Sequence, residues 1–184
     1  MPPSVTSIGV LSFEGCVSLS DIVLSSSIQT IGDNAFAGCS SFIQITIPQS
    51  VTSLGSYLFK DCVTLQKVEI LSNLTKISEG FCRGCTSLNS LPSLSSVVAI
   101  DDNAFNECES LSNIEIPLSV TSLGSYVFSK CKTLEKLTLP SSITKIGESA
   151  FKECASLTEM TIPESVEVIE RAAFKDCVAL KKLI

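Results

Sequence analysis

Hydrophobic positions recur along the chain with a strict period of 23 residues. Eight cysteines form one column of this pattern, each 23 residues after the last: Cys16, Cys39, Cys62, Cys85, Cys108, Cys131, Cys154 and Cys177. Seven of them have a phenylalanine three residues earlier, and each has a leucine or phenylalanine three residues later. The absence of insertions or deletions predicts a stack of eight similar coils.

Each repeat predicts two extended pieces and one compact turn. The segment L-x-x-I-x-I-P alternates apolar and polar positions and is rich in β-branched residues, which is typical of a strand with one buried side. Prolines such as Pro48 end this strand. The following V-T-S-I predicts a second short strand, and glycines such as Gly32 mark the turn after it. Alanine, phenylalanine and cysteine then follow at one-turn spacing, so we expect a short helix or 3₁₀ turn.

One such coil cannot bury its apolar side alone, whereas stacked coils bury a continuous core. No linker interrupts the pattern. We therefore expect residues 1–184 to form a single α/β repeat solenoid domain. Its expected shape is a right-handed superhelix with a parallel sheet on the concave face, short second strands, and short helical or 3₁₀ turns on the other sides.

The fourth repeat departs from the pattern. Ser78 replaces the turn glycine, Pro92 comes two residues earlier than the usual proline, and Ser93 falls in a core column. Proline cannot donate a hydrogen bond to a neighbouring strand. The sequence therefore predicts a bulge or a local kink in the sheet near residues 91–95.

The cysteine column favours buried thiols that pack as small hydrophobic groups, because it is flanked by core positions. The alternative is disulfide bonding, which the odd total of nine cysteines cannot complete. Cys82 and Cys85 form a C-x-x-C pair, which can hold half of a zinc site or a redox couple. The competing interpretation is that Phe81 has moved by one residue and Cys82 fills the space where other repeats place an aromatic ring.

The phrase I-T-I-P-x-S-V-T-S-I/L-G-x-x-x-F-x-x-C-x-x-L occurs from Ile45 to Leu65 and again from Ile114 to Leu134. It resembles the BspA-like class of leucine-rich repeats over the whole chain. The resemblance implies a leucine-rich-repeat superhelix of the kind found on mucosal bacteria and protist parasites. It further implies a cell-surface location and adhesion to host cells, extracellular matrix or other microbes. The alternative function is a cytoplasmic scaffold that docks a protein partner such as a phosphatase, since the chain has no signal peptide.

Composition argues against several other classes of protein. The net charge is -6 and the 13 lysines and arginines are spread along the chain, so a nucleic-acid partner is not expected. No apolar run approaches the roughly 20 residues of a membrane span. Histidine is absent, and no phosphate-binding loop or nucleophile motif occurs. We expect no enzyme activity, no cofactor, no metal site and no small-molecule substrate.

The polar positions of the first strand of each repeat should form two outward files on one face. The first file is Asp21, Gln44, Lys67, Ser90, Asn113, Lys136, Glu159 and Lys182. The second file is Val23, Thr46, Glu69, Pro92, Glu115, Thr138 and Thr161. Solenoids commonly bind partners along such a surface. The predicted protein-binding residues are therefore Gln44, Thr46, Lys67, Glu69, Asn113, Glu115, Lys136, Thr138, Glu159 and Thr161.

The two ends of the repeat array lack polar capping segments. Met1 falls in the core column of Leu24, and the chain stops at Ile184 within a predicted strand. Uncapped solenoid ends expose core and strand edges. We therefore expect that the chain is part of a longer protein, that residues within the end coils cap the stack, or that copies associate end to end.

Overall fold

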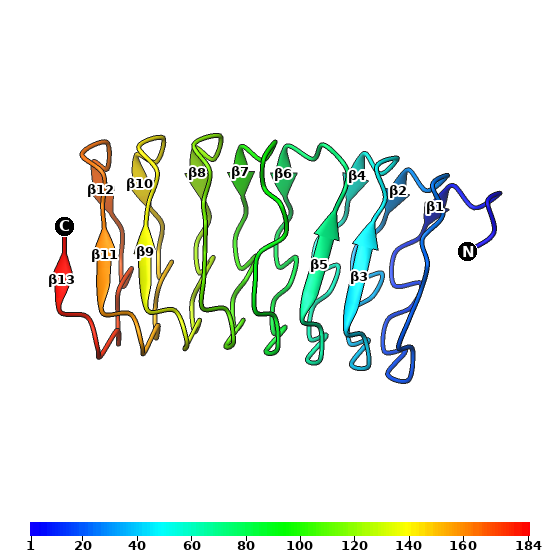
Figure 1. The fold of residues 1–184 in the computed structure, drawn as a ribbon, viewed down its shortest axis with the longest axis horizontal. Helices are drawn as coiled ribbons and strands as arrows, with labels where there is room; N and C mark the ends of the chain where they lie inside the picture. The colour runs from blue at the N-terminus through cyan, green and yellow to red at the C-terminus, as the bar shows by residue number, and fades with distance from the viewer.

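The computed structural model describes residues 1–184 as eight stacked coils, which Figure 1 shows side by side in chain order with the termini at opposite ends. Coil 1 carries Cys16 and coil 8 carries Cys177, and the coils begin at residues 5, 28, 51, 74, 97, 120, 143 and 166. The predicted repeat solenoid is confirmed. No helix in it is long and apolar enough to cross a membrane.

Two rows of strands run along the stack, as the pattern predicts. The first row is β3 (Gln44–Ile47), β5 (Lys67–Ile70), β9 (Lys136–Thr138), β11 (Glu159–Thr161) and β13 (Lys182–Leu183). The second row is β1 (Ser7–Ile8), β2 (Thr30–Ile31), β4 (Ser53–Leu54), β6 (Lys76–Ile77), β7 (Ala99–Ile100), β8 (Ser122–Leu123), β10 (Lys145–Ile146) and β12 (Val168–Ile169). Every pairing is parallel, and paired residues lie 23 positions apart, as Ile45 and Val68 do.

The third side of each coil is a turn and not the predicted short helix or 3₁₀ turn. The reason is that each turn contains two residues with positive φ, four positions apart. In coil 2 these are Asn34 with a φ of 52° and Gly38 with a φ of 72°. A left-handed residue ends a right-handed helical turn, so none can propagate. In each coil, the residues from the first to the second of these positions form the turn face. It runs from Leu11 to Gly15 in coil 1 and from Ala172 to Asp176 in coil 8.

Alternate N–H groups of the turn face bind the next coil. Three backbone hydrogen bonds occur at each of the seven junctions. Between coils 4 and 5, for example, the Cys82 N–H donates to the Ala104 carbonyl at 2.8 Å and the Gly84 N–H to the Asn106 carbonyl at 2.8 Å. The intervening N–H groups donate within their own coil, as Arg83 does to the Gly80 carbonyl. The turn face is therefore a hydrogen-bonded ladder through all eight coils.

A column of phenylalanine rings lies under the turn face. Neighbouring rings in most coils stack almost parallel, such as Phe105 on Phe128 with centroids 5.7 Å apart and an interplanar angle of 6°. The ring of Phe81 in coil 4 instead lies edge-on to Phe59 and to Phe105, at 80° and 77°. Stacked and edge-on pairs are both favourable geometries for aromatic rings. The column is continuous even where the sequence is irregular.

The predicted disturbance in coil 4 is confirmed, and its cause is a shift of one residue. No strand forms at residues 91–95, and Ser90 makes only an isolated bridge with Asn113. The prediction placed Pro92 outward and Ser93 in a core column, and both placements are wrong: Pro92 is buried and Ser93 is exposed. A slip of one residue turns every strand side chain to the opposite face. The slip buries the ring of Pro92 and the side chain of Leu94 and leaves the serine in solvent.

Candidate functional site

The strand face consists of the outward side chains of the first row of strands and of the equivalent residues in coils 4 and 5. Alternation along each strand places these side chains outside, because the residues between them are buried. The ten residues singled out in the sequence all lie on this face. Eight are exposed, and Glu159 and Thr161 on β11 are partly exposed.

Pairing of the strands brings these residues together in two groups. On β3 and β5, Gln44 is opposite Lys67 and Thr46 is opposite Glu69, with the Thr46 hydroxyl donating to Glu69 Oε2 at 3.2 Å. These four residues form the first group. The second group lies on β9 and β11 and is formed by Lys136, Thr138, Glu159 and Thr161. Neither group contains Asn113 or Glu115, which lie on coil 5 between them.

Lysines and carboxylates of the strand face neutralise one another only in part. Lys136 Nζ lies 3.4 Å from Glu159 Oε2. No ion pair involves Lys67, Glu69 or Glu115, although these side chains are exposed on the same face. The face therefore presents charges of both signs that remain free for a partner.

A hollow of about 620 Å³ opens on the strand face where the ladder is interrupted. Coils 4 and 5 line it with Ser90, Leu91, Pro92, Ser93, Leu94, Ser95, Asn113, Glu115, Ile116 and Pro117. A second hollow of about 440 Å³ continues it toward coil 6 and shares Asn113, Glu115 and Ile116 with the first. Sequence reasoning missed this feature, and the early proline of coil 4 was the only signal for it.

The cysteine column is buried as predicted from coil 2 to coil 7, whereas Cys16 is exposed and Cys177 is partly buried. All nine cysteines are free. Each thiol of the column from Cys39 onward donates to a backbone carbonyl 26 residues earlier, as Cys62 does to Phe36 at 3.1 Å. Burial raises the pKa of Cys39 to about 11 and that of Cys154 to about 12. The thiols therefore act as neutral donors that tie neighbouring coils together.

Cys82 and Cys85 are both fully buried in the core of coil 4. The Phe81 side chain is fully buried beside them and continues the aromatic column, so Cys82 occupies the space that the moved ring leaves. No cluster of three or more potential ligands surrounds the pair. The interpretation of Cys82 as a space-filling residue accounts for its position.

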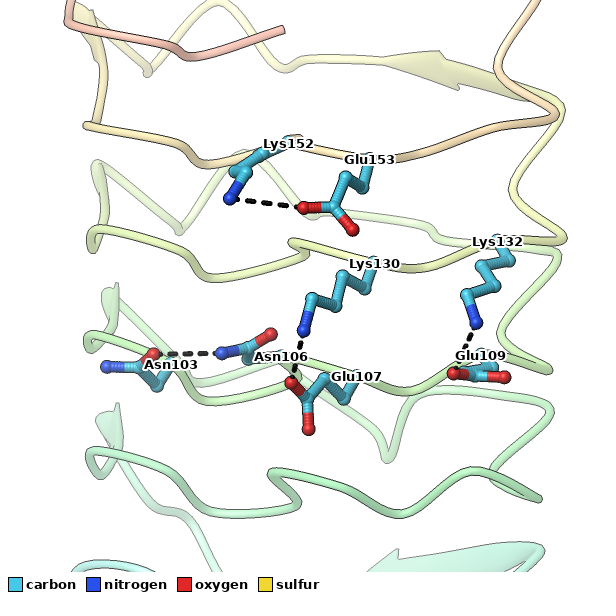
Figure 2. A network of polar contacts seen from close by, with 8 residues as sticks. All are labelled: Asn103, Asn106, Glu107, Glu109, Lys130, Lys132, Lys152 and Glu153. Carbon is cyan, nitrogen blue, oxygen red and sulfur yellow. Dashed lines mark hydrogen bonds and ion pairs between the residues drawn. The ribbon is translucent and has the colours of Figure 1, made fainter. Parts of the chain in front are cut away.

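Ion pairs lie on the turn side of coils 5 to 7, as Figure 2 shows. Lys130 Nζ lies 2.7 Å from Glu107 Oε1, and Lys132 Nζ lies 2.7 Å from Glu109 Oε1. The hydrogen bond to Glu107 raises the pKa of Lys130. These carboxylates and ammonium groups already satisfy one another, in contrast to those near the hollow.

Stacked coils with two rows of parallel strands and a buried cysteine column define a leucine-rich-repeat solenoid, and the family profile makes the assignment specific. The BspA type leucine-rich repeat region matches residues 1–106 and 81–184 with six copies. The chain belongs to this family. Repeat proteins of this class are generally protein-interaction scaffolds and typically have no catalytic role. A comparison with curated protein sequences gave no match.

Solved structures of bacterial proteins have the same fold. A leucine-rich repeat protein from Bacteroides ovatus is 34% identical with a TM-score of 0.93, and the match covers 100% of this chain and 47% of that protein. A leucine-rich cell surface protein from Faecalibacterium prausnitzii is 28% identical with a TM-score of 0.71, and the match covers 100% of this chain and 52% of that protein. The chain thus spans about half the length of these relatives.

Proposed function

We propose that this chain is an adhesion module of a cell-surface protein, and that its strand face binds proteins of host cells, extracellular matrix or other microbes. The ten outward residues predicted from the sequence form the contact surface. Asn113 and Glu115 connect its two groups across coil 5.

The observation that supports this proposal best is the regular array of exposed polar side chains on the strand face. Paired residues such as Gln44 and Lys67 lie in register on neighbouring strands, which are about 4.8 Å apart in any sheet. The buried residues between them, such as Ile45 and Val68, fix the strands on the core. A rigid array of this kind makes many weak contacts, and several weak contacts together give durable attachment.

The proposed location rests on the family and on one relative. The Faecalibacterium prausnitzii protein, 28% identical to this chain, is a leucine-rich cell surface protein. A surface location places the array where host and matrix proteins are accessible. The same array would serve an intracellular scaffold equally well, and free cysteines are typical of reducing compartments.

Binding of the purified chain to immobilised matrix proteins and to cultured epithelial cells tests the proposed surface. We expect a variant with Lys67, Glu69, Lys136 and Glu159 all changed to alanine to lose most of its binding. The matched control changes Glu107, Lys130, Glu109 and Lys132 to alanine, which removes the same charges from the turn side. Equal binding by the two variants would contradict the proposed surface.

Antibody labelling of intact and permeabilised source cells tests the proposed location. Labelling of intact cells is the expected result. Labelling only after permeabilisation would overturn the adhesion proposal and would favour the intracellular docking scaffold.

A further inference from the structure

The hollow of coils 4 and 5 differs from the rest of the strand face in its backbone. In the regular coils, strand N–H groups bind the neighbouring coil, as Lys67 does to the Ile43 carbonyl. Coils 4 and 5 are joined only by the isolated bridge between Ser90 and Asn113, and beyond it the N–H groups of Ser93 and Glu115 donate to no protein group. A backbone donor or acceptor that the protein leaves unpaired is available to a partner.

A buried hydroxyl close to the hollow also lacks the partner that it has in other coils. Ser50 and Ser165 each donate to a carbonyl 22 residues earlier, at 2.6 and 2.7 Å. Ser119 occupies the equivalent position in coil 5, but its buried hydroxyl has no hydrogen-bond partner. Coil 5 therefore lacks this side-chain bond as well as the regular strand ladder.

Charge and exposed apolar surface indicate what kind of chain would fit the hollow. Glu115 is the single charged residue that lines the larger hollow, and it is exposed without an ion pair. Glu69 lies in the same file on β5 and is also free of an ion pair. Leu118 directly follows Pro117, which lines the hollow, and its side chain is 69% exposed. These features favour a basic side chain near Glu115 and an apolar one near Leu118.

We infer that the hollow is a docking groove for an extended segment of a partner protein that carries a lysine or arginine. The segment binds by strand addition, with its backbone paired to the free backbone groups of Ser93 and Glu115. Its cationic side chain meets Glu115. This inference rests on the proposed protein-binding function and assigns that function a particular groove and a particular ligand chemistry.

A displayed library of short random peptides is the probe. The library is selected on the full chain and then depleted on a variant with Pro92→Thr, Ser93→Ile and Leu94→Pro. These changes give coil 4 the L-T-I-P pattern and should close the strand ladder there, because coil 6 has the closely similar L-T-L-P from Leu137 to Pro140. Enriched peptides are synthesised and their affinities measured by fluorescence anisotropy.

We expect the enriched peptides to contain lysine or arginine and to lose at least about tenfold in affinity for the closed variant, because the paired backbone groups are no longer free. Glu115→Gln should weaken binding about two- to fivefold, as an exposed ion pair would. Glu14→Gln is the matched control, because Glu14 is an exposed carboxylate without an ion pair on the turn face of coil 1, and it should leave affinity unchanged. Bound peptide should slow amide exchange at residues 91–95 and 113–116.

Two results would overturn the inference. One is that the full chain enriches no peptide over the closed variant. The other is that enriched peptides protect amides elsewhere, or bind Glu115→Gln and Glu14→Gln alike; this outcome is readable even if the closed variant does not fold. In either case, adhesion of the closed or Glu115→Gln variant to cells would leave the broader proposal of surface binding intact.

Discussion

The turn face and the strand face join the same eight coils to very different extents. The turn face has three backbone hydrogen bonds at every junction, a continuous column of phenylalanine rings and a series of thiol donors. The strand face has paired strands only between coils 2 and 3 and from coil 6 to coil 8, with an isolated bridge between coils 4 and 5. Both faces belong to the same short repeat.

This difference shows that one face holds the stack while the other can vary. Coil 4 tolerates a shift of one residue on the strand face because its turn still makes every bond to coils 3 and 5. A similar disturbance on the turn face would break the backbone hydrogen bonds, the ring contacts and the thiol hydrogen bonds at once. Irregularities that create a binding groove are therefore tolerated on the strand face.

Alkaline pH should produce the largest effect, and it acts on the turn side. Besides Cys39 and Cys154, burial raises the pKa of Cys62, Cys82, Cys108 and Cys131. Above pH 9 the unfolded chain releases thiol protons that the folded chain retains, so the free energy of unfolding falls as pH rises. At pH 10 each buried thiol lowers the free energy of unfolding by about 1.4 kcal/mol. Six such thiols together match a usual total stability of about 5–15 kcal/mol.

Far-ultraviolet circular dichroism should therefore show unfolding near pH 10. Changing Cys131 and Cys154 to alanine should move this transition to higher pH. A transition that the double variant leaves in place would mean that ionisation of the buried thiols does not drive the unfolding.

Truncation of one aromatic ring should have the next largest effect. Phe128→Ala removes a fully buried ring that stacks on two neighbours and should lower the free energy of unfolding by about 3–5 kcal/mol. Ile116→Ala beside the hollow should cost nearer 2 kcal/mol, at the lower end for such changes, because the interrupted face encloses less of the side chain. Urea denaturation of both variants provides the comparison. Equal losses would remove the distinction between the faces.

Closing the ladder in coil 4 should stabilise the protein moderately. The changes Pro92→Thr, Ser93→Ile and Leu94→Pro should permit one or two further hydrogen bonds between coils, each with a net contribution of about 1 kcal/mol. Thermal unfolding measures the gain, and amide exchange at residues 91 and 93 shows whether the bonds form. A less stable protein with unprotected amides would indicate that the one-residue shift is the better packing for this segment.

The ion pairs of the turn side should have the smallest effect. Lys130 and Glu107 are about one-third exposed, so Lys130→Ala should lower the free energy of unfolding by about 0.5 kcal/mol or less. Added salt should reduce even this difference. A loss above about 1 kcal/mol would show that charges contribute to the turn face beyond its backbone bonds.

Much of this architecture could be predicted from the sequence, because alternation and a fixed period determine which residues face inward. Both rows of strands, the phenylalanine column and the outward position of all ten strand-face residues follow from that rule. The helical turn was wrong because left-handed residues such as Tyr57 and Lys130 carry no compositional sign of their backbone conformation. Gly15, Gly38 and Gly84 at the second left-handed position were the available signal.

The hollow could be predicted only as a disturbance. Pro92 indicated where the ladder would fail, but the inward turn of Pro92 depends on which side chains fit the core best. In coil 5 the sequence from Asn113 to Ile116 is regular, and its burial alternates as expected. It nevertheless makes no strand. The physical cause is its irregular neighbour in coil 4, so no pattern within coil 5 could predict the loss.

The identical junctions of the turn face also bear on how such a gene can change. Because each coil offers its neighbour the same bonds and the same ring, any coil can follow any other. Tandem duplication of one whole coil inserts a new neighbour without disturbing those on either side, whereas an insertion of another length puts the later side chains out of phase. Length is therefore the property that recombination within such a gene can alter most readily.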